Sequence, residues 1–270
     1  MDYAEGLKID PRRRPEFALI IPVCDEAACI GPVLDEFLSF VDPERFVIAV
    51  GVNGSMDASA DIARKRPVLV AETNLPGYGH GCMAAIGLTK EIFPSVEAYI
   101  FCAGDGATDP CDLRPLAAAF EEGYDLVLGS RTRRIRNWRN MTVGHVIANA
   151  GLGLWAGLLG GRFFSDLSPM RVIRRSLFER MALEEMTFGW TIEAQIAAAR
   201  LGATICEIPV RERRRIAGRQ KVSGVSWRRT FAIGCQIFSA GWRARGKFRS
   251  APEFPESDYA RSNRRRHQQT

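Results

Sequence analysis

Short apolar runs alternate with longer helix-like segments through the first half of the chain, and this alternation limits the available folds more than any other feature. β-branched residues concentrate in strand-length runs at residues 17–23, 45–52, 67–72, 98–103 and 125–130. The segments between these runs repeat apolar residues at the spacing of an amphipathic helix. Strands separated by helices form βαβ units. The sequence therefore predicts an α/β fold, a mostly parallel central sheet with helices on both faces, and a ligand crevice at the carboxyl ends of the strands.

The composition is that of a globular protein from a reducing compartment. The 270 residues are 46% hydrophobic and 25% charged, which excludes a wholly disordered or fibrous chain. Seven cysteines are scattered with no CxxC pair, so neither a zinc site nor a disulfide scaffold is expected. Residues 1–14 lack the apolar core of a signal peptide, and we therefore expect a cytoplasmic protein.

Positive charge is concentrated near the end of the chain. Residues 211–249 hold twelve Lys or Arg and one acid, a charge of +11, whereas the whole chain carries +6. Such a segment predicts a phosphate-bearing partner, which can be nucleic acid, nucleotide or anionic lipid, or else a solvated basic face. A nucleic-acid binder is disfavoured because the aromatic residues there are not grouped for stacking and no recognition-helix motif is present.

Residues 142–161 contain no charged side chain, which raises the question of a membrane-spanning helix. Their length is about that needed to cross a bilayer, but His145, Asn149 and six glycines interrupt the apolar run. These interruptions favour a buried or interfacial helix over a spanning one.

Farther along, the spacing predicts a helix over 189–202 and a strand over 203–210.

Four parts follow from this organisation. Residues 1–16 are an N-terminal extension and residues 17–224 form the α/β domain. Residues 225–249 predict a basic amphipathic helix, of the kind that lies on anionic lipid or packs on its own domain with arginines in solvent. Residues 250–270 are polar and contain proline, so we expect them to be disordered.

The most informative stretch for chemistry follows the fourth predicted strand. There Asp105 lies between Gly104 and Gly106 in a predicted turn. A carboxylate in such a turn can approach a bound ligand closely, and it can hold a hard divalent cation whose other ligands are pyrophosphate oxygens. Asp109 precedes Pro110 at the predicted start of the next helix, so its expected role is structural.

Several further motifs stand at predicted strand ends and helix starts. They occupy residues 22–26, 53–57, 77–81, 129–131, 166–171, 189–193, 207–215 and 221–224. With the Asp105 turn, and in this order, they resemble the family 2 glycosyltransferases of the GT-A fold. The resemblance is to the branch that includes dolichyl-phosphate mannose and glucose synthases and their soluble bacterial relatives, and it runs from about Phe17 to about Gly224.

The resemblance implies a role for each matching residue. The implied donor-binding residues are Pro22, Cys24, Glu26, Asn53, Gly79, Ala103, Gly104, Asp105 and Arg131. A divalent cation, Mg²⁺ or Mn²⁺, is implied on Asp105. The implied acceptor and phosphate contacts are Arg131, Arg171, Arg215 and Lys221. The implied catalytic set is Asp105, Asp166, Glu193, Arg215 and Lys221.

The reaction implied by the resemblance is transfer of a hexose, with inversion, from a nucleotide sugar to a polyprenyl phosphate or related lipid. The enzyme would act as a peripheral protein on the inner face of the cell membrane. A phosphate monoester, with a second pKa of about 6, is mostly dianionic at neutral pH and can attack unaided. A hydroxyl acceptor would need a carboxylate base, for which Asp166 and Glu193 are the candidates. The alternative for each is structural, as a turn residue or as a paired buried acid.

The chain departs from the family pattern at several positions. Ala103 replaces the first Asp of the DxD motif, and Val52 and Asn53 replace a usual acidic pair. Ala107 replaces a polar residue, and in the basic loop Glu212 and Gln220 replace Tyr and Ser. Fewer carboxylates predict weaker metal affinity and a greater dependence on the diphosphate of the donor. A relative that binds nucleotide sugar or lipid without turnover therefore remains an alternative, as does a soluble transferase with a hydroxyl acceptor.

Overall fold

The computed structural model describes residues 9–141, 143–167, 169–217 and 227–248, and their contacts divide the chain into two compact units. The first unit comprises residues 1–110 with 213–219, and the second comprises the remainder. Lys221, the 221–224 motif and the polar tail after residue 249 lie outside the described residues.

The first unit is built on four parallel strands in the order β3-β2-β1-β4. The strands are β1 (Phe17–Val23), β2 (Phe46–Asn53), β3 (Leu69–Thr73) and β4 (Ala98–Phe101). The helices that connect them are α1 (Ala27–Phe40), α2 (Ser59–Arg64) and α3 (Tyr78–Ile92). All four strands were predicted from the sequence, with boundaries that differ by a few residues at most.

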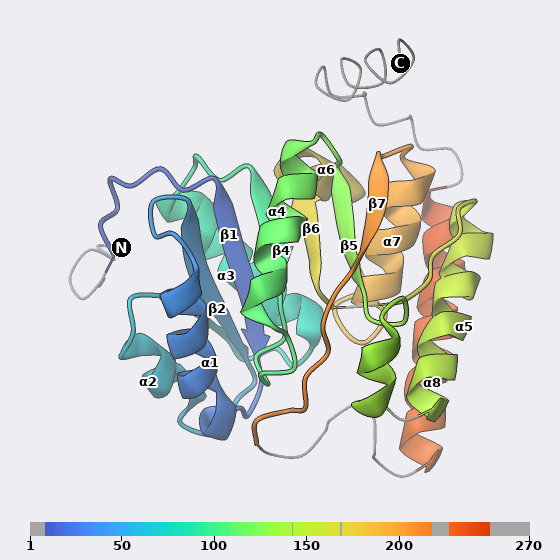
Figure 1. Ribbon diagram of the computed structural model, residues 1–270, viewed down its shortest axis with the longest axis horizontal. Helices are drawn as coiled ribbons and strands as arrows, with labels where there is room; N and C mark the ends of the chain where they lie inside the picture. Colours follow the sequence, from blue (N-terminus) through green and yellow to red (C-terminus); the bar gives the residue numbers. More distant parts are fainter. Residues whose placement is uncertain (1–8, 142, 168, 218–226, 249–270) are drawn as a thin grey trace. The chain divides into compact units, whose positions relative to one another are not determined.

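β1 and β2 are central strands, and their sequences explain this position. Nearly every side chain in both is buried, as expected for strands that helices cover on both faces. Figure 1 shows α1 and α3 on opposite faces of these strands. Because parallel strands share a direction, the residues that follow β1, β2 and β4 all emerge at one edge of the sheet.

Two glycines let α3 approach β2 closely. A Cβ atom on Gly51 would lie 1.9 Å from the carbonyl oxygen of Gly81, and one on Gly81 would lie 2.7 Å from Oδ1 of Asn53. Both contacts involve the backbone or a buried side chain, so they leave no space for a methyl group. The start of α3 is thereby held against the end of β2.

Gly51→Ala is expected to destabilise the protein by about 1–3 kcal/mol, because the added methyl group overpacks the contact between β2 and α3. Gly87→Ala in α3 is the matched control, since a Cβ atom there meets nothing within 4 Å. The control should be neutral or stabilising, because alanine is the better helix former. Urea unfolding of both variants measures the difference, and equal midpoints would contradict the close approach.

The second unit contains three strands, with β5 between β6 and β7. These are β5 (Leu126–Ser130), β6 (Arg171–Arg174) and β7 (Ile205–Pro209). β7 runs parallel to β5 and β6 runs antiparallel to it. β5 and β7 were predicted, whereas β6 was not. The predicted α/β class with mostly parallel strands is confirmed.

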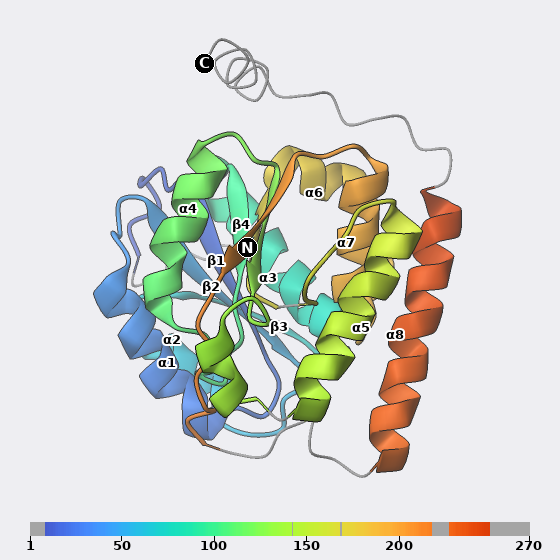
Figure 2. The same cartoon turned by 45° about the vertical axis from the view of Figure 1, so that its right-hand side comes forward.

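The helices of the second unit are α4 (Leu113–Glu121), α5 (Val143–Gly160), α6 (Arg175–Met181), α7 (Trp190–Arg200) and α8 (Trp227–Lys247), with short 3₁₀ turns at Pro110–Asp112 and Ile135–Arg139. Two of them, α4 and α6, contact the strands of this unit, and three others, α5, α7 and α8, contact one another. α7 is almost wholly buried and contacts both α5 and α8, which lie side by side in Figures 1 and 2. Within the described ranges, none of the helices combines the length and apolarity needed to cross a bilayer.

Candidate active site

Asp105 lies in the turn that follows β4, and the turn fixes its direction. Gly106 has φ +81°, and a Cβ atom there would meet Ile216 at 2.4 Å, so the bend depends on glycine. Oδ1 of Asp105 accepts the backbone N–H of Ala107 at 3.0 Å, and its carbonyl oxygen accepts that of Ile216 at 3.1 Å. The side chain remains 24% exposed. Asp105 is therefore held firmly while its carboxylate stays accessible.

Arg215 joins Asp105 to Glu26, which follows β1. Its Nη1 donates to Oδ2 of Asp105 at 3.2 Å, its Nη2 donates to the carboxylate of Glu26, and its Nε donates to the carbonyl of Ala217 at 2.7 Å. Burial alone would lower the pKa of Arg215, but the hydrogen bond and charge of Glu26, with the charge of Asp105, outweigh it and raise that pKa. The guanidinium therefore stays charged between two carboxylates.

The loops that follow β1 and β2 are tied together by short polar side chains. Asp25 has φ +50°, a left-handed conformation that Asp tolerates better than most residues. Its N–H donates to Oγ of Ser55 at 2.9 Å, and its Oδ1 accepts the N–H of Met56 at 2.7 Å. Asp57 accepts the N–H of Ala27 at 2.9 Å. These contacts hold the two strand ends in register.

Ser59 adds another hydrogen bond between these loops, because its Oγ accepts the backbone N–H of Glu26 at 2.8 Å. The roles of Asp25, Asp57 and Ser59 were missed by the sequence reasoning. Asp57 belongs to the 53–57 motif, which was identified only because it follows a strand. Its position does not reveal that its partner is Ala27, thirty residues away in the sequence.

The structure brings together most of the predicted donor-binding residues in the first unit. Pro22, Cys24 and Glu26 lie at the end of β1, Asn53 ends β2, and Gly79 lies in the first turn of α3. Ala103, Gly104 and Asp105 follow β4. All eight stand at the carboxyl ends of parallel strands or at a helix start, which is where this class of fold binds ligands.

The carboxylate of Asp105 fits one protein ligand of a divalent cation. Mg²⁺ and related hard cations are commonly held by one or two carboxylates together with substrate phosphates and water. Among the described residues no group of three or more acidic, histidine or cysteine side chains is arranged to hold a metal by itself. A cation here would therefore need the diphosphate of the donor for most of its remaining ligands.

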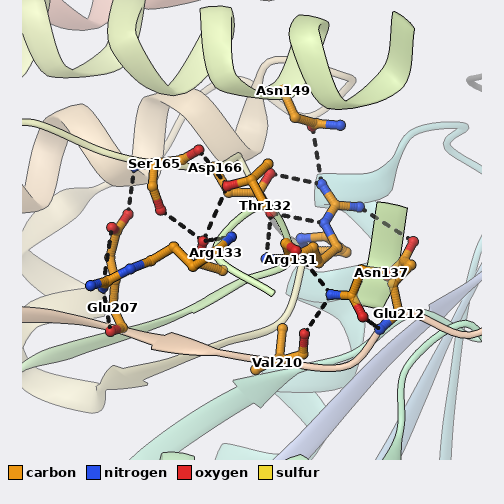
Figure 3. Close-up of polar contacts among 12 residues, drawn as sticks. Arg131, Thr132, Arg133, Asn137, Asn149, Ser165, Asp166, Glu207, Val210 and Glu212 are labelled. Atoms are coloured by element: carbon orange, nitrogen blue, oxygen red, sulfur yellow. Dashed lines mark hydrogen bonds and ion pairs between the residues drawn. The ribbon is translucent and has the colours of Figure 1, made fainter. Parts of the chain in front are cut away.

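In the second unit, Arg131 is enclosed by a polar cluster, drawn in Figure 3. Oδ2 of Asp166 accepts both the backbone N–H of Arg131, at 2.8 Å, and its Nε, at 3.0 Å. Nη2 donates to Oδ1 of Asp166 and to Oδ1 of Asn149, both at 3.0 Å. Oε1 of Glu212 lies 3.6 Å from Nη1 of Arg131. Burial alone would lower the pKa of Arg131, but the charges and hydrogen bonds of Asp166 and Glu212 outweigh burial and raise that pKa.

Asn137 links this cluster to the chain that follows β7. Its Nδ2 donates to the carbonyl oxygens of Arg131, at 2.9 Å, and Val210, at 2.7 Å, and its Oδ1 accepts the N–H of Glu212 at 3.0 Å (Figure 3). Asn137 was not singled out from the sequence. An asparagine in a basic turn carries no signal that three backbone groups will converge on it.

Arg171 and Glu193 are also buried in the second unit. Arg171, in β6, is fully buried, and its Nη1 donates to the carbonyl of Thr191 at 3.2 Å. The carboxylate of Glu193 accepts the backbone N–H groups of Glu184, at 3.1 Å, and Glu185, at 2.8 Å. Nζ of Lys247 lies 3.8 Å from it. The expected roles of Arg171 and Glu193 remain predictions.

Three of the four arginines between residues 211 and 215 are paired with acids, and Arg214 is exposed. Arg211 pairs with Asp112 at 2.9 Å, and Arg213 pairs bidentately with Glu36 at 2.7 and 2.8 Å. Arg215 joins Glu26 and Asp105, as described above. These long-range partners offset much of the charge that composition alone assigned to the segment, so a uniform basic surface for nucleic acid is not formed by residues 211–215.

Comparisons with known proteins point to one enzyme class. No family model matches the chain. An uncharacterized glycosyltransferase of Mycobacterium tuberculosis is 28% identical over 214 residues, covering 76% of this chain and 89% of that protein. The dolichyl-phosphate hexose transferase of Haloferax volcanii is 29% identical over 209 residues, covering 77% and 86%.

Solved structures support the fold. Glucosyl-3-phosphoglycerate synthase from Mycobacterium tuberculosis, in complex with Mn²⁺, UDP and glucosyl-3-phosphoglycerate, superposes with a TM-score of 0.64 at 20% identity, covering 86% of this chain and 80% of that one. The same synthase with Mg²⁺ and UDP gives a TM-score of 0.60 at 19% identity, covering 90% and 83%. At such identity the likeness establishes the fold.

Proposed function

Since this chain is a glycosyltransferase of the GT-A type, we propose that it transfers a hexose from a nucleotide sugar to a lipid-linked phosphate, of the polyprenyl phosphate kind. We place this reaction at the inner face of the cell membrane. The observation that carries the proposal is the cluster of Asp105, Arg215 and Glu26 beside the carboxyl ends of β1 and β4.

The charges of this cluster suit a nucleoside diphosphate and its cation. Two carboxylates and one guanidinium sum to −1. A divalent cation would change the local sum to +1, which is complementary to the diphosphate of the donor. Bound at Asp105, Mg²⁺ or Mn²⁺ would supply Lewis-acid stabilisation of the diphosphate charge.

Arg215 has the chemistry to assist the leaving group. In the transfer, an acceptor oxygen forms a bond to the anomeric carbon while the bond from that carbon to the diphosphate breaks. The electron pair of the broken bond stays on the diphosphate oxygen. A charged guanidinium that is already fixed stabilises this developing charge without reorganising at the moment of reaction.

The two candidate general bases favour a phosphate acceptor. The carboxylate of Asp166 accepts three hydrogen bonds from Arg131, and that of Glu193 accepts backbone N–H groups of the 184–185 segment. Both carboxylates are thus engaged in holding the second unit together. An acceptor that is itself an anionic nucleophile needs neither of them, whereas a hydroxyl acceptor would need one.

The relatives point to two different acceptors. The Haloferax volcanii relative is named a dolichyl-phosphate hexose transferase, which supports a lipid-linked phosphate. The glucosyl-3-phosphoglycerate synthase structures contain UDP-glucose and phosphoglyceric acid, whose acceptor is a small soluble molecule. A soluble acceptor with a hydroxyl nucleophile is therefore the second candidate, and the acceptor must be tested directly.

The test incubates the full chain and Mn²⁺ with labelled UDP-, GDP- or ADP-hexoses and polyprenyl phosphate. We expect one nucleotide to raise the melting temperature and to pass label into the organic phase, with release of the nucleoside diphosphate. Saturation at about 100 times Kd should add about 2.7 kcal/mol to the free energy of unfolding. The matched control is the same polyprenol without phosphate, which should accept no label.

Three results would contradict the proposal. Donor binding without diphosphate release indicates a non-catalytic relative. Label that reaches 3-phosphoglycerate but not lipid indicates the soluble reaction. Equal transfer to the polyprenol and its phosphate indicates a hydroxyl acceptor and a working carboxylate base.

A further inference from the structure

α5 and α8 expose large apolar side chains to an unusual degree. Eleven large hydrophobic side chains are exposed in the described chain, and five of them lie on these two helices: Ile147, Leu154, Leu158, Phe238 and Trp242. Scattered exposed hydrophobics are ordinary, but a concentration on two neighbouring helices marks a docking surface. We call these five side chains, with Trp155, the apolar face.

The outer side of α5 is apolar. Ile147, Gly151, Leu154 and Leu158 follow one another at spacings of four, three and four residues, so they share one exposed side of the helix. Leu159 is buried on the other side, and the helix contains no Asp, Glu, Lys or Arg. The polar side chain of Asn149 is buried against Arg131, whereas the outer side of α5 exposes these apolar residues to solvent.

The apolar face continues from α5 onto α8. The ring of Trp155 stacks on Phe238 with centroids 4.0 Å apart, and Trp242 lies 6.3 Å from Trp155 at nearly parallel planes. Figures 1 and 2 show the two helices side by side. Tryptophan and phenylalanine of this kind, next to leucines, are typical of surfaces that lie at a membrane interface.

Positive charge borders the apolar face. α8 has five basic residues and no acid, and two of them, Arg243 and Lys247, pair with Glu185 and Glu184 outside the helix. Arg245 is exposed and has no carboxylate partner among the described residues. The guanidinium of Arg245 lies over the ring of Trp242, 5.4 Å from its centroid. A positively charged margin around an apolar surface is complementary to anionic lipid.

We propose that α5 and α8 dock on the surface of an anionic lipid bilayer, with the apolar face in the interface. A second copy of the chain fits less well, because a two-fold contact across this face would bring the basic residues of both copies together. The inference rests on the proposed function in one respect. A lipid-linked acceptor would lie in the same bilayer on which the protein docks.

The test is sedimentation of the full chain with vesicles of phosphatidylcholine and phosphatidylglycerol at low salt. The wild-type protein is expected to pellet, and the double variant Leu154→Gln/Leu158→Gln to lower the vesicle partition coefficient on the order of ten-fold. Arg245→Gln should weaken binding several-fold on these vesicles and have little effect on phosphatidylcholine alone. Leu75→Gln is the matched control, since Leu75 is 56% exposed in the first unit and should not affect binding.

Two outcomes would overturn the inference. One is equal pelleting of the wild-type protein and the double variant. The other is a wild-type dimer in vesicle-free buffer that the double variant converts to monomer, without vesicle binding, which would assign the face to a second copy. Because the donor-induced rise in melting temperature is measured without vesicles, it reports the proposed function separately from membrane docking.

Discussion

Asp105→Asn is expected to lower kcat/KM for hexose transfer by on the order of 10²–10³, the size of effect seen when one group that stabilises transition-state charge is removed. Asparagine has the same shape and still accepts the N–H of Ala107, so the turn is kept. The variant loses the negative charge that would attract a cation to the diphosphate. Steady-state kinetics over a range of Mn²⁺ concentrations measure the loss, which a high Mn²⁺ concentration should restore only in part.

The control for Asp105→Asn separates chemistry from folding. Asp105 is about a quarter exposed, so its pairing with Arg215 contributes little to stability, and the melting temperature should stay within about 3 °C of the wild-type value. Asp109→Asn, four residues along the same segment, should leave activity within about two-fold, because its expected role is structural. Activity of Asp105→Asn close to that of the wild type would remove Asp105 from the site.

Asp166→Asn should unfold the protein at a much lower temperature, because it leaves the buried guanidinium of Arg131 without its main counter-charge. Asp166 is 1% exposed at its side chain and Arg131 is 8% exposed. Breaking a buried pair by removing one partner costs about 3–5 kcal/mol, which corresponds to a fall in Tm of roughly 10 °C for a chain of this size. Differential scanning calorimetry measures the change.

Two comparisons sharpen the Asp166 prediction. Glu179→Gln removes the charge from the more exposed pair that Glu179 forms with Arg175 in α6, and it should cost at most about 0.5 kcal/mol. Combining Asp166→Asn with Arg131→Gln should cost less than the sum of the single variants, because neither charge is then left alone. If Asp166→Asn instead kept the wild-type Tm and lost only kcat, Asp166 would act as a general base.

The predicted elements were right where local pattern decides structure. β1 and β2 are continuous apolar runs, and strands of this kind are recognisable because helices cover both of their faces. β6 was missed because it is four residues long and begins and ends with arginine. It is a strand because it pairs with β5, and that pairing depends on a neighbour more than forty residues away.

The candidate site was predictable in part for the same reason. A glycine-flanked acid after a strand identified Asp105, since the turn and its side chain belong to one short segment. The partners of Asp105 were not predictable in this way. Arg215 pairs with Glu26, which is 189 positions away in the sequence. The hydrogen bonds of Asp25 and Asp57 join loops that are about thirty residues apart.

The amino-acid sequence by itself determined the alternation of strands and helices, the place of Asp105 and the excess of basic residues, because each is a property of neighbouring residues. Only the tertiary structure decided which charges are offset and which surface stays apolar. Arg131 and Arg215 look alike in the sequence, yet one is enclosed with Asp166 and the other stands between Glu26 and Asp105. Such pairings depend on packing between distant segments, and local sequence carries no record of that packing.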